Sequence, residues 1–524
     1  MSVGPDVLVL GGGHNGLVAA VLAASAGKTV TLIERSGAPG GATVGERVFP
    51  PHPARLSRYS YLIALLPDEL IRRLGIAIPL ASRAVSSYTP VMRGGIATGL
   101  LVERNLGTAT QDSFRAVTGS GDDFAAWRQL YAEIRALAGV VAPALTGPLR
   151  RRSDVADAVV DAAGSRVWTD LVEEPIGAMI ERRFRDDTVR GVVGTDGLIG
   201  THTSLFAEDL LANRCFLYHL VGRGTGEWLV PIGGMGALTD ALLRRARQLG
   251  VEIHCGTEVV NIEETADEVT VTGLRDGDEV AFAAPHLLAA VAPAVLDRCL
   301  GRETEDPVGA QIKINMLLDR LPRLKSGMDP RVAFTGTVHL NEELSELEAA
   351  HSITAAGSLP PVVPSEVYCH SLTDPTIMNG YPGASLTLFG LHTPIGLFRE
   401  NPDEARSAAA QGALIALQKH LAEPLLDCLA RDENGEPCVD IASPVDLERS
   451  LAMPGGNIFH DDLSWPWLAD DFPADTPAAA HGVEVLGSRR ILLAGAGSRR
   501  GGGVSGLGGA AAVDALLELT GGSS

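Results

Sequence analysis

Short apolar runs separated by glycine-rich turns open the chain. Residues 6–10 form a compact apolar run of valine and leucine after one acid, and residues 29–33 form a second run with β-branched side chains. Such uninterrupted apolar runs are typical of strands buried on both faces of a parallel sheet. The small apolar residues between them, 17–23, favour a helix. This order predicts a strand–helix–strand unit near the N-terminus.

The same alternation returns in the middle and at the end of the chain. Apolar residues at helical spacing predict an amphipathic helix at 238–249. Runs rich in β-branched and apolar residues predict the strands that follow it, at 251–254, 258–262, 269–271 and 286–291. A last predicted strand, 491–494, leads into a glycine-rich loop and a helix at 510–519.

The loop after the first predicted strand carries Gly11, Gly13 and Gly16 at the spacing GxGxxG. Gly11 permits a tight turn, Gly13 admits a pyrophosphate to the backbone, and Gly16 lets the helix pack closely on the sheet. The positive end of the following helix then faces the phosphates. Glu34 ends the second predicted strand, where a carboxylate accepts hydrogen bonds from a ribose. An acid at this position argues against the 2′-phosphate of NADP.

Two further glycine segments favour FAD over NAD. Gly40, Gly41 and Ala42 follow the ribose-binding acid, although this pattern alone also fits an ordinary turn. The second strand–glycine loop–helix unit, near the C-terminus, contributes the candidate cofactor residues Gly495, Gly497, Gly503, Val504 and Ser505. If these two units, one near each end of the chain, hold the same cofactor, that cofactor must be long, which favours FAD. We expect the dipole of the terminal helix and the N–H groups near Val504 to favour anionic reduced flavin.

Composition and charge limit the classes of molecule that the protein is expected to bind. A net charge of −21 disfavours nucleic acid and the anionic membrane leaflet. The six cysteines include no CxxC pair, so the sequence predicts no disulfide framework, no dithiol redox centre and no metal site. Such isolated cysteines fit a reducing, cytoplasmic setting. No stretch reaches transmembrane length without charges, which predicts a soluble protein and leaves peripheral membrane contact open.

Along most of the chain these motifs resemble the phytoene dehydrogenase and carotenoid isomerase branch of the FAD-dependent, amine-oxidase-like flavoproteins. Within that branch they resemble the pyridine nucleotide–disulphide oxidoreductase domain-containing protein 2 group. The stretches that carry the resemblance are 13–18 with His14 and Asn15, Glu34-Arg35 through Gly40-Gly41-Ala42, 228–238, 446–449, 455–460 and 495–506.

The resemblance implies an α/β fold, namely a GR2-type (amine-oxidase-like) Rossmann FAD-binding domain with an inserted α+β substrate domain. The expected FAD-binding domain is discontinuous, at 1–85, 225–300 and 485–524, and the substrate domain occupies 86–224 and 301–484. The resemblance also implies that the backbone of Val259 contacts the adenine, and that His14, Asn15 and Arg35 belong to the cofactor site.

Candidate catalytic residues come from the segments that the resemblance places near the flavin. His460 is either a base for the substrate proton or a residue that fixes its own loop. Asn457 either holds the same loop or touches the flavin edge. Arg500 stands, after Arg499, where the family usually has a His-Pro pair. Its guanidinium either adds positive field at the flavin or lies on the surface.

These inferences predict a small-molecule oxidoreductase with FAD as cofactor. We expect an FAD-dependent dehydrogenase or oxidase (desaturase) that forms C=C or C=N in a mainly apolar small organic substrate by hydride transfer to the flavin N5. No second dinucleotide fingerprint is present, so the expected electron acceptor is dioxygen, a quinone or another molecule. A flavin-dependent isomerase without net oxidation is the alternative. A non-catalytic prenyl-protein-binding module of related fold is a third hypothesis, which the intact glycine motifs disfavour. The oligomeric state stays open.

Overall fold

A parallel sheet assembled from three distant parts of the chain forms one end of the molecule. The computed structural model describes residues 4–521, and this five-stranded sheet has the order β19-β13-β1-β2-β9. Its strands are β1 (Val7–Leu10), β2 (Val30–Ile33), β9 (Glu252–His254), β13 (His286–Ala289) and β19 (Ile491–Leu493). Every pairing in it is parallel, with Val7 opposite both Val30 and His286. All residues of β1 and β2 are buried, as expected for strands covered on both faces.

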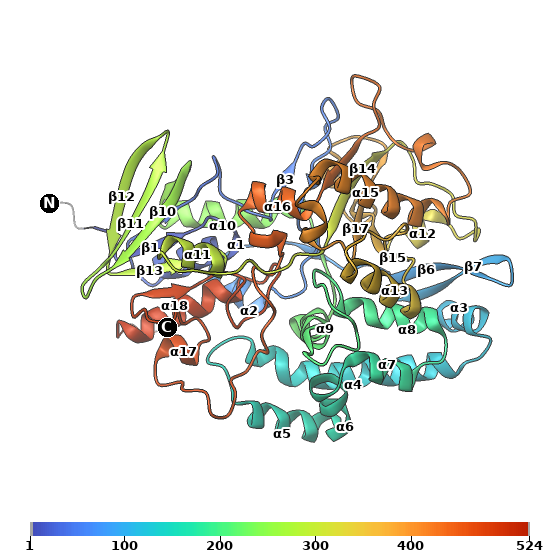
Figure 1. Cartoon of the computed structure of the whole chain (residues 1–524), viewed down its shortest axis with the longest axis horizontal. Helices are drawn as coiled ribbons and strands as arrows, with labels where there is room; N and C mark the ends of the chain where they lie inside the picture. Colours follow the sequence, from blue (N-terminus) through green and yellow to red (C-terminus); the bar gives the residue numbers. More distant parts are fainter. Residues whose placement is uncertain (1–3, 522–524) are drawn as a thin grey trace.

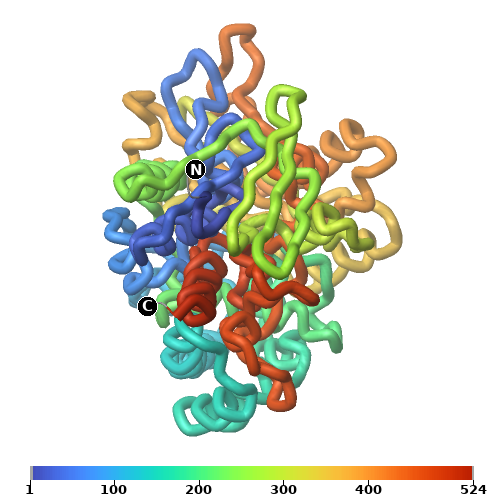
Figure 2. Tube along the Cα trace, turned by 90° about the vertical axis from the view of Figure 1, so that its left-hand side faces the viewer, coloured from blue at the N-terminus to red at the C-terminus, as the bar shows by residue number. Residues whose placement is uncertain are grey.

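Helices cover one face of this sheet and an antiparallel meander covers the other. On the first face, Val7, Val9 and Leu32 pack against helices. These helices are α1 (His14–Ser25), α2 (Asp68–Leu74), α10 (Gly236–Gln248) and α18 (Leu507–Leu519). On the second face, Leu8 and Ile33 pack against other elements. Those elements are β10 (Thr257–Glu264), β11 (Val269–Arg275), β12 (Asp278–Ala284) and α11 (Pro293–Cys299). Figure 2 shows the N-terminal segment, the meander and the C-terminal helix side by side, although hundreds of residues separate them.

A second, mixed sheet stands beside the first. Its order is β18-β14-β17-β16-β15-β6-β7, and only the pairing of β15 with β6 is parallel. The strands are β6 (Val85–Arg93), β7 (Ile96–Glu103), β14 (Ile312–Leu318), β15 (Thr337–Leu340), β16 (Ser365–Tyr368), β17 (Ala384–Gly390) and β18 (Val439–Ala442). Ile314, Val338 and Leu388 are fully buried in the core between this sheet and α15 (Pro402–Gln418).

A group of helices packs below the second sheet, as Figure 1 shows. They are α3 (Thr108–Thr118), α4 (Asp122–Ala144), α5 (Arg152–Ala163), α6 (Ser165–Trp168), α7 (Ile176–Arg183), α8 (Asp187–Gly194) and α9 (Leu211–Val221). Their largest buried side chains are aromatic, among them Phe114, Trp127 and Trp168, and they form one continuous core with Tyr218. Burying aromatic rings contributes the most apolar area per residue, so this core stabilises the helical layer.

Short elements complete the architecture. The remaining strands are β3 (Gly45–Glu46), β4 (Leu56–Ser57), β5 (Leu80–Ala81) and β8 (Val230–Pro231). The remaining α-helices are α12 (Pro330–Ala333), α13 (Leu344–Ala355), α14 (His370–Thr373), α16 (Pro444–Leu451) and α17 (Pro477–Ala480). Strands β5 and β8 pair antiparallel, which joins the segment before β6 to the segment that leads from α9 back to α10.

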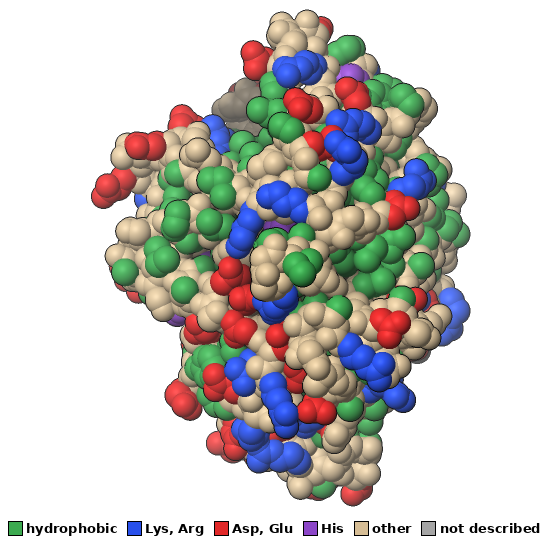
Figure 3. All heavy atoms as spheres, turned by 90° about the vertical axis from the view of Figure 1, so that its right-hand side faces the viewer, with side chains coloured by type: hydrophobic (Ala, Val, Ile, Leu, Met, Phe, Trp, Pro, Cys, Tyr) green, Lys and Arg blue, Asp and Glu red, His purple; other side chains and the backbone are tan. Residues whose placement is uncertain are grey.

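Charges of both signs lie interspersed among apolar side chains on the face that Figure 3 shows. Among residues 4–521, none of the helices combines the length and the apolar character needed to cross a membrane. All six cysteines lie within these residues and are free thiols.

Around the first sheet, the observed elements differ from the predicted ones at two helix starts, at the end of β11, which runs to Arg275 instead of residue 271, and in β12, which was not predicted. The helix predicted at 17–23 begins at His14, directly after Gly13, and the one predicted at 510–519 begins at Leu507. In both cases the helix starts inside the glycine motif. Its first turn, whose N–H groups face the phosphates, carries few apolar residues, so the apolar pattern did not reveal it. The expected domain boundaries near 85, 225, 300 and 485 stay predictions.

Candidate active site

One long cavity of about 630 Å³ runs from the first sheet to the second. At one end it is lined by Leu10 of β1, Ile33 of β2 and Val259 of β10. At the other end it is lined by Lys313 of β14 and Phe389 of β17. Since the carboxyl ends of the parallel strands open onto it, the cavity occupies the usual ligand position of an open α/β sheet.

The first end of the cavity is a glycine cradle. A side chain at Gly13 would meet nothing within 4 Å, so this backbone faces open space inside the cavity. At Gly16, by contrast, a Cβ would lie 1.9 Å from the Gly11 carbonyl oxygen. Gly13 therefore leaves room for a ligand, whereas Gly16 leaves room for the protein's own backbone. Together they bring the N-terminus of α1 to the cavity.

Glu34 lies in the wall of the cradle and is already engaged by its own loop. Its Oε2 accepts a hydrogen bond from the N–H of Gly12 at 2.6 Å, and its Oε1 accepts one from Ser36 at 2.7 Å. These bonds fix the carboxylate at the cavity wall and leave each oxygen a further lone pair for a ribose hydroxyl.

Most predicted cofactor residues of the N-terminal segment line this end, together with Val259 of β10. They are Gly11, Gly13, His14, Asn15, Glu34, Arg35, Gly41, Ala42 and Val259. Arg35 also donates from Nη2 to the Ser450 carbonyl at 3.1 Å, which ties the cradle to α16 and the residues after it. Gly40 stands behind the lining, where a Cβ would lie 2.6 Å from Val44 Cγ1.

The C-terminal glycine loop closes the cradle from the other side. Gly503 and Val504 line the cavity, and a Cβ at Gly503 would meet nothing within 4 Å. The other predicted residues of this loop lie behind the lining and serve packing. A Cβ at Gly495 would approach the Val291 carbonyl oxygen to 2.8 Å, and one at Gly497 would approach Pro293 Cδ to 2.5 Å. Ser505 is buried, and its Oγ accepts a hydrogen bond from the N–H of Leu507 at the start of α18.

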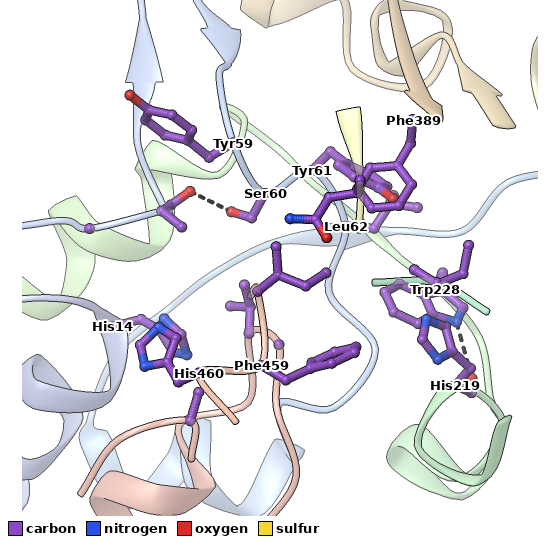
Figure 4. Close-up of a pocket in the computed structure, with 18 of the residues that line it drawn as sticks. His14, Tyr59, Ser60, Tyr61, Leu62, His219, Trp228, Phe389, Phe459 and His460 are labelled. Atoms are coloured by element: carbon purple, nitrogen blue, oxygen red, sulfur yellow. Dashed lines mark hydrogen bonds between the residues drawn. The ribbon is translucent and has the colours of Figure 1, made fainter. Parts of the chain in front are cut away.

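Two neighbouring histidines, His14 and His460, lie where the two glycine loops meet (Figure 4). Burial, with His460 alongside, lowers the pKa of His14 to about 4, and burial lowers the pKa of His460 to about 4. His14 Nε2 and His460 Nδ1 are buried without a hydrogen-bond partner among residues 4–521. Buried polar atoms are nearly always paired, so unpaired atoms beside an open glycine cradle fit a polar ligand. The residues present therefore fit the dinucleotide part of FAD.

Two of the three predicted catalytic residues lie outside the cavity lining. Arg500 is fully buried and donates from Nε to the His481 carbonyl at 2.8 Å and from Nη1 to the Leu145 carbonyl at 3.1 Å. Both earlier interpretations are corrected, because the guanidinium neither lies on the surface nor reaches the cavity. Asn457 accepts a hydrogen bond from the N–H of Phe459 at 2.8 Å and donates to the Val308 carbonyl at 3.2 Å. Its side chain holds the loop, while His460 alone of the three lines the cavity.

The second end of the cavity is aromatic. Tyr61 packs against Tyr368 with ring centroids 4.7 Å apart and against Phe389 at 5.9 Å. Trp228 stacks on His219 at 4.9 Å and donates from Nε1 to the carbonyl of the same residue, as the dashed line in Figure 4 shows. We call the space bounded by these five side chains the aromatic chamber. Its walls are chiefly apolar and suit a hydrophobic substrate.

A buried lysine, which the sequence reasoning missed, lies beside this chamber. Lys313 Nζ donates to the carbonyls of Ser57 at 2.7 Å and Tyr59 at 2.5 Å, and it lies 5.1 Å from the Tyr61 ring centroid. Desolvation by burial lowers the pKa of Lys313 well below its ordinary value, although Asp440 opposes that shift. The available signal was a single lysine in the otherwise neutral strand 312–318, where a charge fits poorly unless it has a task.

A His/Glu/Glu grouping lies near the aromatic chamber. Donor atoms of His339, Glu342 and Glu366 lie within 4.8 Å of one another, in an arrangement of metal-ligand type. The nearest pair, His339 Nδ1 and Glu342 Oε2, is separated by 2.7 Å. Glu342 follows His339 by three residues, whereas Glu366 joins them only because β15 and β16 pair, which no sequence pattern indicated.

Comparisons with known proteins agree with this geometry. Residues 6–164 match the model of a family described as FAD dependent oxidoreductase, and residues 165–348 match that of the flavin containing amine oxidoreductase family. The chain is similar to Uncharacterized protein Rv0897c of Mycobacterium tuberculosis, with 43% identity over 98% of this chain and 97% of the relative. It is also similar to the mouse pyridine nucleotide-disulfide oxidoreductase domain-containing protein 2, with 28% identity over 96% of this chain and 92% of the relative.

Solved structures show the same fold. A putrescine oxidase variant matches with a TM-score of 0.56 at 17% identity, covering 99% of both chains. Cyclohexylamine oxidase from Brevibacterium oxydans matches with a TM-score of 0.53 at 15% identity, covering 98% of this chain and 100% of the oxidase. The α/β fold predicted from the sequence, an amine-oxidase-like FAD-binding fold, is therefore confirmed.

Fold and site together define a flavin-dependent oxidoreductase. The chain is an FAD-dependent oxidoreductase with an amine-oxidase-like fold, since two flavin-oxidoreductase family models match adjoining parts of it, and FAD is its cofactor. It is accordingly an enzyme, and the hypothesis of a non-catalytic prenyl-protein-binding module is not supported.

Proposed function

We propose that the protein is an FAD-dependent dehydrogenase or oxidase that forms C=C or C=N in a mainly apolar small organic substrate. The observation that carries this proposal is the continuity of one cavity from the glycine cradle to the aromatic chamber. When bound, FAD supplies an acceptor for the hydride that leaves a substrate carbon. The substrate also loses a proton, so the chain must provide a group that takes it.

The aromatic chamber orients the substrate. Tyr61 and Phe389 form one wall, and the stacked pair of Trp228 and His219 forms another. Flat apolar walls bind an extended or cyclic hydrocarbon skeleton and exclude water from the reacting carbon. Burial lowers the pKa of His219 to about 4, so this histidine is neutral at pH 7 and adds no charge to the wall.

Lys313 is the chain's best-placed proton acceptor. A neutral amine has two N–H donors and one lone pair. The carbonyls of Ser57 and Tyr59 accept both donors, which leaves the lone pair free for a proton. The lowered pKa of Lys313 favours this neutral form. His460, at the cradle end beside His14, is proposed to position the loop that covers the cofactor.

Anaerobic mixing of the purified holoprotein with apolar amines and polyenes tests the proposal. Bleaching of the visible flavin band, with a product two hydrogens lighter, is the expected result for at least one compound. Dioxygen or a quinone then restores the band. A product of unchanged mass with no acceptor consumed would identify the alternative, an isomerase without net oxidation.

The variant Lys313→Met separates the proton-accepting role from mere flavin binding. We expect it to retain FAD and to slow bleaching, because it removes the proton acceptor but leaves the cradle intact. Lys325→Met is a matched control, since Lys325 is exposed and its side chain bonds only the Lys419 carbonyl among the described residues. Equal bleaching rates for both variants would contradict the role of Lys313.

A further inference from the structure

A buried arginine in the cavity wall lacks a counterion. Arg83 lies between β5 and β6 and is 6% exposed. Within residues 4–521 its side chain makes one hydrogen bond, a long one from Nη1 to Thr337 Oγ1 at 3.4 Å. Its Nε is buried without a partner, and no carboxylate of these residues lies within 4 Å of the guanidinium.

The acids nearest to Arg83 are committed to other groups. Glu366 accepts a hydrogen bond from the Tyr368 hydroxyl and lies 3.5 Å from His339 Nδ1. Glu227 accepts a hydrogen bond from Ser82 and lies 3.4 Å from Arg104 Nε.

Arg104 is a second arginine in the same wall. It also has a buried Nε without a hydrogen-bond partner among residues 4–521. Glu227 Oε1 is its ion-pair partner at 3.4 Å, so of these two arginines Arg83 is the one whose charge no residue among 4–521 neutralises by direct contact.

An unpaired buried charge is costly, and proteins rarely keep one without a use. The free-energy cost of removing a guanidinium from water is offset only by a partner of opposite charge or by a full set of hydrogen bonds. Arg83 is buried, and desolvation lowers the pKa of its guanidinium. Its planar fork of N–H donors matches the two oxygens of a carboxylate.

We infer that Arg83 binds a carboxylate of the substrate, so that the substrate is an apolar monocarboxylic acid. This inference rests on the proposed function and narrows its substrate class. A carboxylate suits the site better than the dianion of a phosphate ester, because one guanidinium is unpaired and its N–H fork matches two oxygens that share one negative charge.

The position of Arg83 suits a head group held away from the reacting carbon. Its Cζ lies 5.8 Å from the Tyr368 ring centroid, and the Tyr368 and Tyr61 rings are 4.7 Å apart. Lys313 Nζ lies 5.1 Å from the Tyr61 centroid. Arg83 thus contacts the Tyr368 ring and Lys313 the Tyr61 ring of one aromatic pair, against which the apolar part of a substrate can lie.

Binding of 4-phenylbutanoate, its amide 4-phenylbutanamide and phenyl phosphate to the holoprotein tests the inference without turnover. Binding is followed by tryptophan fluorescence, since Trp127 and Trp228 line the cavity, and by perturbation of the flavin spectrum. We expect saturable binding of the carboxylate that is at least about tenfold tighter than binding of the amide or the phosphate. Equal binding of the amide, tighter binding of the phosphate, or no saturable binding of the carboxylate would overturn the inference.

Three variants assign the effect to Arg83. Arg83→Met should weaken carboxylate binding by about 10- to 100-fold and leave binding of the amide unchanged. Arg83→Lys should fall between Arg83→Met and the parent, because it keeps the charge but loses the fork. Arg128→Met is the matched control, since Arg128 is exposed on α4, and it should bind as the parent does.

Thermal unfolding without ligand gives an independent readout. Because Arg83→Met replaces an unpaired buried charge, its Tm should equal or exceed that of the parent. A clear fall in Tm would instead mark Arg83 as a structural residue and overturn the inference. Carboxylate binding without any substrate oxidation would contradict the proposed function but leave the site at Arg83 standing.

Discussion

Replacing Gly13 by alanine separates the cofactor's needs from those of the fold. Gly13 has φ −67° and ψ 176°, a conformation that any residue adopts. Its Cβ would meet no protein atom within 4 Å. The variant should therefore fold normally. Its unfolding free energy should rise by about 0.4–1 kcal/mol, because alanine restricts the unfolded chain.

The same methyl group should impair FAD binding. It projects into the open space beside the N-terminus of α1, where the pyrophosphate has to approach the backbone. Inserting one methyl into a close-packed site costs about 1–3 kcal/mol, which corresponds to roughly 5- to 150-fold weaker binding. Titration of the apoprotein with FAD, followed by quenching of flavin fluorescence, measures this change.

Gly16→Ala is the matched comparison. Its Cβ would lie 1.9 Å from the Gly11 carbonyl oxygen and 3.1 Å from Ala290 Cβ, so the backbone itself must move. We expect a loss of about 3 kcal/mol or more in unfolding free energy, measured by urea denaturation. Wild-type FAD affinity in Gly13→Ala would refute the assigned path of the pyrophosphate, and undiminished stability in Gly16→Ala would refute the packing role.

Other perturbations address the remaining residues. Lys313→Met should slow anaerobic flavin reduction by roughly 100-fold. In the parent, the reduction rate should fall as the pH drops through the lowered pKa of Lys313, because the ammonium form cannot accept a proton. If the reduction rate of Lys313→Met still fell over the same pH range, the assignment would be contradicted. Arg500→Met should cost roughly 2–4 kcal/mol of unfolding free energy, since two carbonyls lose a charged donor, and should leave FAD affinity unchanged in a titration. Burial lowers the pKa values of His14, His219 and His460 to about 4, below the ordinary 6.5. The unfolding free energy should therefore be at its full value above about pH 6.5 and should fall toward pH 4, by about 1.4 kcal/mol per pH unit for each proton that only the unfolded chain binds. Urea midpoints that stay constant over this range would contradict neutral buried imidazoles.

The sequence carried most of the information about the cofactor end of the molecule. Glycine spacing, the strand before Gly11 and the acid at Glu34 each have a local mechanical reason, so they are visible without a structure. The helix starts were predicted several residues late, because residues such as His14 and Leu507 begin their helices within the loops that precede the apolar stretch.

The substrate end could not be predicted in the same way. Tyr61, Tyr368 and Phe389 come from three separate segments and meet only because β16 and β17 pair and the loop after β4 crosses them. Arg500 shows the opposite error, since its place in a cofactor motif suggested a role at the flavin. Its burial among backbone carbonyls is a tertiary fact that no local pattern reveals.

The most direct test of the central claim is the flavin content of the purified protein, released by denaturation and identified by chromatography. We predict one FAD per chain, with a visible spectrum that dithionite bleaches and an acceptor restores. The FAD content of Gly13→Ala should be clearly lower although the stability of its apoprotein is undiminished. Parent protein that folds in flavin-replete cells yet holds no FAD, and takes none up on titration, would contradict the assignment of the cavity to an FAD-dependent oxidation.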